Sequence, residues 1–501
     1  MQFSFTQDLN NLPGSIILPV SKNGSYEGGL SIASQLTGIE ITWFKDHFSA
    51  EMKEMMVLPF QGKTLFLMGL GNEDRFTAAN KTMRYLVHNH KSKLPKNFGL
   101  VLSHIPHEED AKSVMEGCVL GLELGRYQIG IYKTEKTDLQ VIDQKDVFIT
   151  LQIQKDWTFW AQQLAPKTVS TARTQIRIMD LVNAPANKKR PEVLGQWAKD
   201  SGEQFGYSVK VLDKTDIEKE GLHGLLAVNR GSEDPPVFIL MEYKPKKQTK
   251  EKLTTFGLIG KGVTFDTGGI SLKPSSNMYL MKSDMGGAAA IMGTVELAAR
   301  LQLQVHLVAA IPVTDNSIGS TAIKPSDVIQ SYSGKTIEII DTDAEGRLIL
   351  ADGLSYIAKN YRPDVMINAA TLTGSAVRTF GNHAGALFSK NDNLADQLIA
   401  ASNASQERLW RLPLWDSYAD EIKSDVADVR NLSMKPTAGA ISAAKFLEVF
   451  TDNHPAWAHM DIAGMCLQDS EFSGQRAATG FGPRLLTTFL ENYKDKCKLV
   501  G

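Results

Sequence analysis

Short apolar runs alternate with longer runs of helical spacing through the first third of the chain. Runs rich in β-branched residues predict strands, and apolar positions three and four apart predict helices. The predicted strands are 15–20, 64–68, 98–102 and 147–153, and the predicted helices are 73–90 and 109–124. This alternation indicates a sheet with helices packed on its faces. No cluster of acidic, His or Cys residues marks a reaction centre here, so the function of this region stays open.

A long run of helical spacing, at about 158–181, ends at Asn183-Ala184-Pro185. We place the domain boundary at this helix and count the helix with the second domain, which gives domains 1–160 and 161–501. Beyond it the strand–helix alternation resumes, glycine becomes frequent, and acidic residues follow apolar strands. We therefore expect an α/β fold, with a smaller α/β N-terminal domain and a larger α/β second domain on a mixed central sheet.

Composition narrows the class of protein. The 501 residues are 43% hydrophobic and 22% charged, which is ordinary globular usage and argues against wholesale disorder. The net charge of −2 provides no overall basic field for nucleic acid. Three widely spaced cysteines, Cys118, Cys466 and Cys497, favour neither a disulfide framework nor a Cys-rich zinc site. The N-terminus lacks a basic region typical of secretory signals, and no apolar run approaches about 20 residues. We expect a cytoplasmic protein without a membrane partner.

One basic cluster, 244–252 (KPKKQTKEK), interrupts this balanced pattern. We interpret it as a solvated hairpin tip between two strands. The alternative, a nucleic-acid patch, needs aromatic or basic neighbours in the folded protein.

Segment 337–350 (IEIIDTDAEGRLIL) places three acids and an arginine between a short strand and a helix. The acids are Asp341, Asp343 and Glu345, followed by Arg347. Loops at the carboxyl ends of strands form the ligand crevice of α/β sheets, and crowded carboxylates require cations. The alternative is that these acids cap the first turn of the helix.

Segment 258–290 adds two more acids at glycine-rich junctions. Asp266 ends an apolar strand that Gly260 and Gly262 interrupt, and Asp284 precedes a loop into an Ala-rich helix. Asp266, Asp284, Asp343 and Glu345 together offer enough carboxylates for two divalent ions.

Two lysines lie in the same segment. Lys261 is inside the interrupted strand, and Lys273 follows Asp266 by seven residues. Each is either a solvated side chain or part of the site. A neutral amine can ligate a metal, and a charged one can stabilise an oxyanion.

Other catalytic signatures are missing from the sequence. There is no HExxH motif, no phosphate-binding GxxxxGK[ST] loop and no GxSxG elbow.

These segments resemble the cytosolic leucyl aminopeptidase family, the M17 metallopeptidases. The family signature NTDAEGRL appears as DTDAEGRL at 341–348. The similarity continues through GKGVTFDTGGISLKP, MKSDMGGAAA, NAATLTG, AHMDIAG and ATGFGPRLL, and covers most of the chain after about residue 170. By position and alternation, the N-terminal third looks like the family's variable, macro-domain-like region.

The resemblance implies removal of N-terminal amino acids from peptides by a metal-bridging water. One metal would be held by Lys261, Asp266, Asp284 and Glu345, and the other by Asp266, Asp343 and Glu345. The resemblance also implies that Lys273 stabilises the gem-diolate and that Arg347 holds a bicarbonate. The substrate-binding positions it implies are Met281, Thr371, Leu372, Gly374, Ala463 and Cys466.

The resemblance further implies a homohexamer acting on peptides whose first residue is apolar, such as Leu. Carboxylate-rich ligation suits Mn or Mg, and a nitrogen ligand is compatible with Zn or Co; we favour Zn or Mn. Three departures concern specificity: Asp341 replaces the usual Asn, Cys466 stands where some members have Met, and 313–317 (VTDNS) lacks the usual Glu-Asn-Met pattern.

Two other functions are weighed against the aminopeptidase. Some bacterial members of the family also act on DNA, so a DNA-binding accessory protein is one alternative. A two-metal phosphoesterase is the other, although no His ligands gather around the acids.

Overall fold

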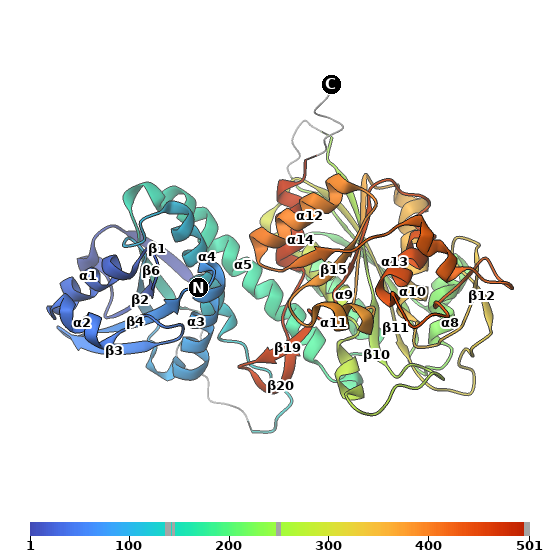
Figure 1. The fold of residues 1–501 in the computed structure, drawn as a ribbon, viewed down its shortest axis with the longest axis horizontal. Coiled ribbons are helices and arrows are strands. Elements are labelled where there is room, and N and C mark those ends of the chain that lie inside the picture. The colour runs from blue at the N-terminus through green and yellow to red at the C-terminus, as the bar shows by residue number, and fades with distance from the viewer. Residues whose placement is uncertain (136–141, 143–145, 247–251, 495–501) are drawn as a thin grey trace. The chain divides into compact units, whose positions relative to one another are not determined.

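The structure, a computed structural model, describes residues 1–135, 142, 146–246 and 252–494. It divides into two compact units, Met1–Ile176 with Ser470–Gly474, and Arg177–Asp469 with Gln475–Gly501 (Figure 1). The division falls inside α5 (Thr158–Asn183), the long helix that the sequence predicts.

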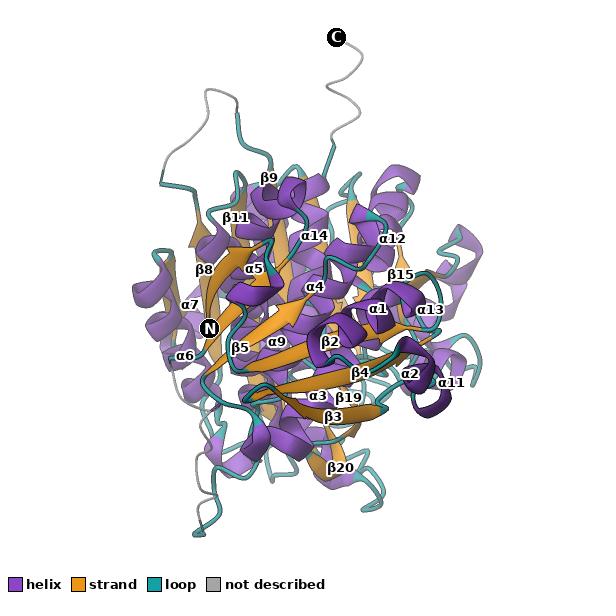
Figure 2. Ribbon diagram, turned by 90° about the vertical axis from the view of Figure 1, so that its left-hand side faces the viewer, coloured by secondary structure: helices purple, strands orange, loops and turns teal. Residues whose placement is uncertain are grey.

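The smaller unit is built on a six-stranded sheet of order β1-β6-β5-β2-β4-β3. The edge strand β3 pairs antiparallel with β4, and the other neighbours are parallel. Figure 2 shows β5, β2, β4 and β3 side by side. The bounds are β1 (Gln2–Thr6), β2 (Ser15–Ser21), β3 (Met55–Phe60), β4 (Lys63–Gly71), β5 (Asn97–Val101) and β6 (Phe148–Gln152). The sequence patterns predict β2, β4, β5 and β6 and miss both edge strands.

Helices cover both faces of this sheet because strand side chains alternate in direction. Ile16 and Leu18 of β2 pack in the cluster that includes Leu30 of α1 and Phe44 of α2. Ile17, between them, packs with side chains of α3, α4 and the first half of α5. The bounds are α1 (Tyr26–Thr37), α2 (Ile41–His47), α3 (Arg75–His90) and α4 (Glu108–Leu124).

The larger unit is built on a mixed sheet of order β16-β15-β18-β14-β9-β11-β8-β7, with β10 pairing β11. Strands β18, β14, β9, β11 and β10 run parallel, whereas β7, β8 and β15 introduce antiparallel pairs. The bounds are β7 (Ser208–Leu212), β8 (Val237–Tyr243), β9 (Thr255–Gly260), β10 (Gly262–Asp266), β11 (His306–Asn316), β14 (Val365–Ala370), β15 (Gly385–Phe388), β16 (Leu409–Arg411) and β18 (Trp457–Asp461). This confirms the expected α/β class with a mixed central sheet.

Smaller sheets and helices complete this unit. The short strands are β12 (Val328–Gln330), β13 (Thr336–Glu338), β17 (Val429–Arg430), β19 (Leu467–Ser470) and β20 (Ser473–Ala478). The helices after α5 are α6 (Pro191–Phe205), α7 (Lys214–Glu220), α8 (His223–Asn229), α9 (Gly286–Leu301), α10 (Gly346–Tyr361), α11 (Gly374–Phe380), α12 (Asp392–Ser405), α13 (Gly439–Glu448) and α14 (Pro483–Asn492).

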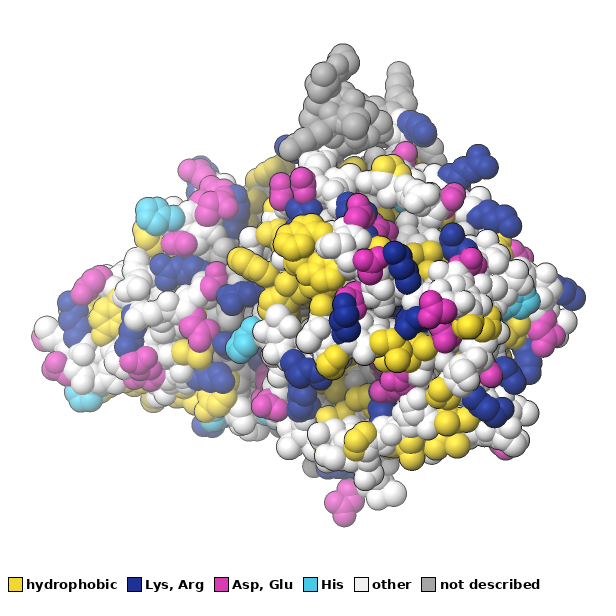
Figure 3. Space-filling model, turned by 45° about the vertical axis from the view of Figure 1, so that its right-hand side comes forward, with side chains coloured by type: hydrophobic (Ala, Val, Ile, Leu, Met, Phe, Trp, Pro, Cys, Tyr) yellow, Lys and Arg dark blue, Asp and Glu magenta, His cyan; other side chains and the backbone are white. Residues whose placement is uncertain are grey.

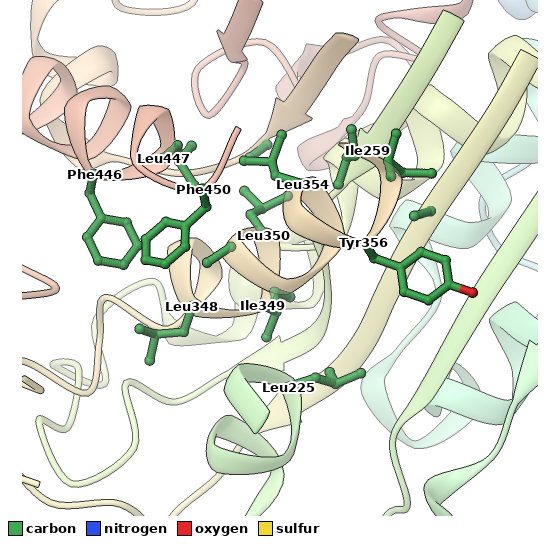
Figure 4. Packing of buried hydrophobic residues seen from close by; sticks show 14 of the residues in the cluster. Leu225, Ile259, Leu348, Ile349, Leu350, Leu354, Tyr356, Phe446, Leu447 and Phe450 are labelled. Carbon is green, nitrogen blue, oxygen red and sulfur yellow. The ribbon is translucent and has the colours of Figure 1, made fainter. Parts of the chain in front are cut away.

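Helix α10 lies at the centre of the main hydrophobic core of this unit. Leu350 and Leu354 of α10 pack with Ile259 of β9 and with Phe446 and Phe450 from the α13 region (Figure 4). Burying side chains of this size contributes about 1.5–3 kcal/mol each. The core therefore holds the N-terminal end of α10 at a defined place beside the sheet.

The hairpin interpretation of 244–252 is wrong. Strands β8 and β9, which flank this segment, both pair with β11 and are separated by it. A hairpin requires neighbouring strands, so the segment is a connection across β11. Residues 247–251 of the cluster lie outside the described residues.

Within the described ranges, no helix combines the length and apolar character needed to cross a bilayer.

Candidate metal centre

The parallel strands of the larger unit bring five chemically important residues to one edge of the sheet. Lys261 follows β9, Asp266 and Asn316 end β10 and β11, Thr371 follows β14, and Asp461 ends β18. These strands run in the same direction, so their carboxyl ends meet where α/β sheets bind ligands. Sequence positions up to 200 residues apart are thereby brought to one site.

The remaining acids come from segments that face this edge. Asp343 and Glu345 lie just before α10, and Asp284 lies between a 3-10 helix (Met278–Ser283) and α9. Helix α9 begins at Gly286, so the glycines after Asp284 belong to the helix rather than to the loop that the sequence suggests.

Three of the acids form a compact cluster. Asp266, Asp343 and Glu345 each offer a carboxylate oxygen, and these oxygens lie within 4.8 Å of one another. The Glu345 side chain caps no main-chain group of α10. Helix capping therefore does not account for Glu345, and the interpretation as a ligand cluster is favoured.

Lys261 lies deep in this cluster. It is 3% exposed, and its Nζ lies 2.7 Å from Asp284 Oδ2 and 2.9 Å from Glu345 Oε1. A Cβ atom at residue 346 would lie 2.6 Å from this Nζ, so Gly346 leaves the room that the lysine occupies. These contacts exclude an ordinary solvated lysine at this position.

Lys273 approaches the cluster from the turn after β10. Its Nζ lies 2.8 Å from Asp266 Oδ2 and also pairs with Asp343. Gly268, at φ +87°, forms the turn, and a Cβ there would lie 3.0 Å from the Lys273 amide nitrogen. The side chain is 20% exposed, so its ammonium group reaches solvent as well as the acids.

The pKa shifts of the lysines and the acids show that each group depends on its charged neighbours for its own charge. Burial opposes the charged form of Lys261, but the carboxylates of Asp284 and Glu345 raise its pKa well above the ordinary value. Burial raises the pKa of Asp284 and of Glu345, and both Lys261 contacts oppose that shift. Burial, with Asp266 and Glu345 nearby, raises the pKa of Asp343 to about 7. The acids are therefore stable as anions only beside cations.

The donor set fits two divalent cations. Asp284 Oδ2, Asp343 Oδ1 and Glu345 Oε1 are buried and accept no regular hydrogen bond from the described residues. Their close neighbours of opposite charge are the two lysine ammonium groups. Oxygen-rich ligation with one amine nitrogen suits hard and borderline ions.

Neutral side chains orient the acids. Thr371 Oγ1 donates to Asp284 Oδ1 at 2.8 Å, and Asn316 Nδ2 donates to Asp266 Oδ1 at 2.9 Å. Sequence reasoning treated Thr371 as a cleft residue and Asn316 as part of a departure from the family pattern. Neither contact has a signal in the local sequence, because each joins segments that are at least 50 residues apart.

Asp461 is a second residue whose role the sequence does not reveal. It is buried, and its Oδ1 accepts main-chain hydrogen bonds from Leu372 at 3.1 Å and Ala463 at 3.2 Å. Its Oδ2 accepts from Thr373 Oγ1 at 2.6 Å. Asp461 therefore holds the two loops that carry several predicted substrate-binding positions. Its place in AHMDIAG, at the end of an apolar strand, is the available sequence signal.

Arg347 is buried in the first turn of α10. Its Nη1 donates to the Asn431 carbonyl at 2.6 Å, while its Nε has no hydrogen-bond partner among the described residues. Burial lowers the pKa of Arg347 to about 10. An unpaired, buried guanidinium nitrogen beside the acids is suited to an anion.

Asp341 stabilises the turn that precedes the cluster. Its Oδ1 accepts a hydrogen bond from the Asp343 amide at 2.8 Å, and the Asn431 side chain binds both its amide and its carbonyl. An Asn side chain could accept the same bond. The replacement therefore preserves the local geometry and adds a carboxylate to the site.

A cavity of about 770 Å³ opens over the cluster. Of the residues that the sequence singled out, those on its surface are Lys261, Asp266, Lys273, Met281, Asp284, Asp341, Asp343, Arg347, Thr371, Leu372, Gly374 and Ala463. Glu345 lies beneath them. Cys466 is buried behind the wall, where its Sγ lies 3.7 Å from the Ser283 carbonyl.

Comparison with known proteins identifies relatives of the whole chain. A family model described as the cytosol aminopeptidase family, catalytic domain, matches residues 177–487. A probable cytosol aminopeptidase of Chloroherpeton thalassium is 38% identical over 96% of this chain and 97% of its own. One of Chlorobaculum tepidum is 50% identical over 66% of this chain and 64% of its own.

Solved structures give the same result. A cytosol aminopeptidase from Coxiella burnetii matches with a TM-score of 0.80 and 31% identity, over 98% of this chain and 99% of that one. A tomato leucine aminopeptidase mutant matches with a TM-score of 0.82 and 27% identity, over 98% and 97%. The bottromycin maturation enzyme BotP in complex with Mn matches with a TM-score of 0.78 and 29% identity, over 95% and 99%. These relatives support the peptidase hypothesis and give no support to the DNA-binding alternative.

Proposed function

Because the chain belongs to the cytosol aminopeptidase family, whose members are dinuclear-metal aminopeptidases, we propose that the carboxylate–lysine cluster is its catalytic centre. The observation that carries this proposal is the set of carboxylate oxygens of Asp266, Asp343 and Glu345 within 4.8 Å of one another, facing a cavity of about 770 Å³. The activity is assigned to the C-terminal domain, residues 161–501, because every site residue lies in it.

We propose the two ligand sets that the family resemblance implies. One cation would be bound by Lys261, Asp266, Asp284 and Glu345, and a second by Asp266, Glu345 and Asp343 with its main-chain carbonyl. Lys261 supports the first set because its Nζ already lies between Asp284 and Glu345. As a ligand it must give up a proton, since only the neutral amine has a lone pair. When bound, two divalent cations lower the pKa of water and polarise a carbonyl.

Lys273 is proposed to be the oxyanion donor. Its ammonium group lines the cavity at the edge of the cluster and is partly exposed. A cation fixed there donates to the carbonyl oxygen of the first peptide bond as that oxygen gains charge. Its pKa, raised by Asp266 and Asp343 against the effect of burial, keeps it protonated at neutral pH.

Arg347 is proposed to hold a bicarbonate ion. The unpartnered Nε supports this role, because a planar guanidinium pairs well with a planar oxyanion. Bicarbonate supplies a basic oxygen when it is bound.

The first residue of the peptide is proposed to lie against Met281, Thr371, Leu372, Gly374 and Ala463, with Cys466 behind them. The apolar side chains on this wall favour Leu and similar residues. Asp461 holds the wall in place through its bonds to Leu372, Thr373 and Ala463.

A homohexamer is part of the proposal. Large exposed apolar side chains of this unit include Trp410, Trp415, Val426 and Met434, each at least 65% exposed. Figure 3 shows hydrophobic side chains gathered in patches on the larger unit. Apolar surface of this kind is typical of contacts between subunits. Light scattering that gives the mass of a single chain would contradict the hexamer.

A cytoplasmic location completes the proposal. Its support is the name cytosol aminopeptidase, which the relatives carry.

The test is hydrolysis of leucine p-nitroanilide by the purified protein after chelation, with Zn, Mn, Co or Mg then added back singly. We expect chelation to abolish activity and Zn or Mn to restore it, with Co or Mg as weaker substitutes. Failure of all four ions, with leucyl dipeptides also uncleaved, would contradict the proposed function.

A further inference from the structure

The cavity over the metal centre carries opposite charges along its length. Its acidic part holds Asp266, Asp284, Asp341 and Asp343. Two arginines from other elements, Arg378 of α11 and Arg476 of β20, also line it. The roles proposed above for the metal centre and the first-residue wall use neither arginine.

Arg378 is exposed and available to a ligand. Among the described residues, no side-chain or main-chain group forms a hydrogen bond or ion pair with its guanidinium. Its Nη1 lies 3.3 Å from the place that a Cβ on Gly374 would take, so the guanidinium lies over this part of the cavity wall.

Arg476 adds a second positive charge that lacks a carboxylate partner in the described part of the chain. Its Nη2 donates to Asn382 Oδ1 and to the Leu467 carbonyl, both at 2.7 Å. Both acceptors are neutral, so they fix the side chain without cancelling its charge. The cavity is therefore lined by two arginines whose charges no described carboxylate neutralises.

The wall that joins the metal centre to Arg378 is short. Thr371 contacts the metal-ligand candidate Asp284, and Arg378 lies over Gly374. Three Cα steps join Thr371 to Gly374, so these residues are at most about 11 Å apart. Two or three residues of extended peptide, at about 3.5 Å each, span a distance of this order.

We propose that Arg378, assisted by Arg476, binds the C-terminal carboxylate of the substrate, so that this enzyme prefers di- and tripeptides with a free carboxyl end. The inference rests on the proposed function, because the amino end must lie at the metal centre. A peptide of this length can extend from the metal centre along the Thr371–Gly374 wall, over which Arg378 lies. Arginine pairs with carboxylates through two parallel N–H bonds, which gives both attraction and orientation.

The test compares leucylglycine with leucylglycinamide, which differ only in the terminal carboxylate. We expect kcat/KM for leucylglycine to be about tenfold higher in the wild-type enzyme, since hydrogen bonds to charged groups are among the stronger ones. In Arg378→Gln the ratio should fall close to one, and in Arg378→Lys part of it should persist. Arg408→Gln is the matched control, because Arg408 is also exposed in this unit but does not line the cavity.

Two further substrates identify which carboxylate the enzyme recognises. In leucylaspartic acid diamide, the side-chain carboxylate and the C-terminal carboxylate are both blocked as amides. In leucylaspartic α-amide, the C-terminal carboxylate is blocked and the side-chain carboxylate is free. We expect both to be cleaved as slowly as leucylglycinamide. A preference for the side-chain carboxylate alone would overturn the assignment to the chain end.

The outcomes separate the inference from the function it rests on. Equal kcat/KM for acid and amide in the wild type, or a ratio that Arg378→Gln leaves unchanged, overturns the inference while leaving the aminopeptidase intact. Absence of leucine release from every substrate, including leucine p-nitroanilide, contradicts the proposed function instead. Melting temperatures of the variants show that a lower ratio does not arise from unfolding.

Discussion

The hydroxyl of Thr371 donates a 2.8 Å hydrogen bond to Oδ1 of Asp284. The Thr371 carbonyl also accepts a hydrogen bond from Lys261 Nζ at 3.0 Å. A residue of the substrate wall thus orients two of the proposed metal ligands, which couples the shape of the cleft to the metal centre.

Thr371→Val should weaken metal binding while keeping the volume of the side chain. Loss of a partner that orients a ligand typically lowers metal affinity 10–100-fold. Titration of the chelated protein with Zn or Mn by calorimetry measures the change. Thr379→Val is the control, because the Thr379 hydroxyl donates to the Ser375 carbonyl on α11, away from the metal ligands. Equal affinities in the two variants would refute the orienting role.

Lys273→Met should reduce turnover with little effect on metal content. Removing one donor to a developing oxyanion typically lowers kcat by about 10²–10³. Steady-state kinetics with leucine p-nitroanilide and elemental analysis of bound metal give the two quantities. Lys324→Met, at an exposed lysine of the same unit, should retain wild-type kcat. Wild-type turnover in Lys273→Met would remove this residue from the mechanism.

Removal of metal should leave the protein folded but less stable. The ammonium groups of Lys261 and Lys273 pair with the acids without any metal, which limits repulsion among the carboxylates. Each site should contribute about 2.7 kcal/mol when free metal is at 100 times its Kd. Thermal melts of chelated and reloaded protein test this, and an unfolded chelated protein would contradict it.

Asp461→Ala should destabilise the loops that form the first-residue wall. It leaves the partly buried main-chain N–H groups of Leu372 and Ala463 without their acceptor, at a cost of about 3 kcal/mol. Urea unfolding measures the stability, and KM for leucine p-nitroanilide should rise. Asp364→Ala is the control, since Asp364 is exposed and accepts from one amide, that of Thr255. A larger loss in the control than in Asp461→Ala would contradict the prediction.

Because of Lys189, the stability of the folded protein should change with pH in the alkaline range. It is fully buried, its Nζ donates to the carbonyls of Val182 and Lys282, and burial lowers its pKa to about 7. Between pH 7 and the ordinary value of 10.5, the unfolded chain binds this proton more strongly, so the folded state gains stability as pH rises.

Lys189→Met removes this titration. The free energy of unfolding of the wild type, minus that of the variant, should therefore increase from pH 7 to pH 10, by at most about 1.4 kcal/mol per pH unit. Denaturant unfolding at several pH values measures it. Lys188→Met, at the exposed neighbour, should show no such trend. A pH-independent difference for Lys189→Met would show that the buried amine stays charged.

Local patterns predicted much of the fold because apolar residues recur at a regular spacing in strands and in helices. They indicated β2, β4, β5 and β6 of the smaller unit but missed β1 and β3 at its edges. Edge strands such as β3 are half-exposed, so their apolar pattern is weak. The predicted hairpin failed for another reason: consecutive strands usually pair, but here β11 inserts between β8 and β9.

By itself, the sequence indicated which groups we propose for the chemistry: four acids and two lysines in two short motifs, whose residue types and spacing are local properties. Tertiary structure alone decided what surrounds them. Asp461, Thr371 and Asn316 bond to residues from other segments of the chain, Cys466 lies behind the wall, and Arg378 lines the same cavity as the acids. The physical reason is that parallel strands bring their carboxyl ends together whatever their separation in sequence, and no local pattern records which side chains then meet.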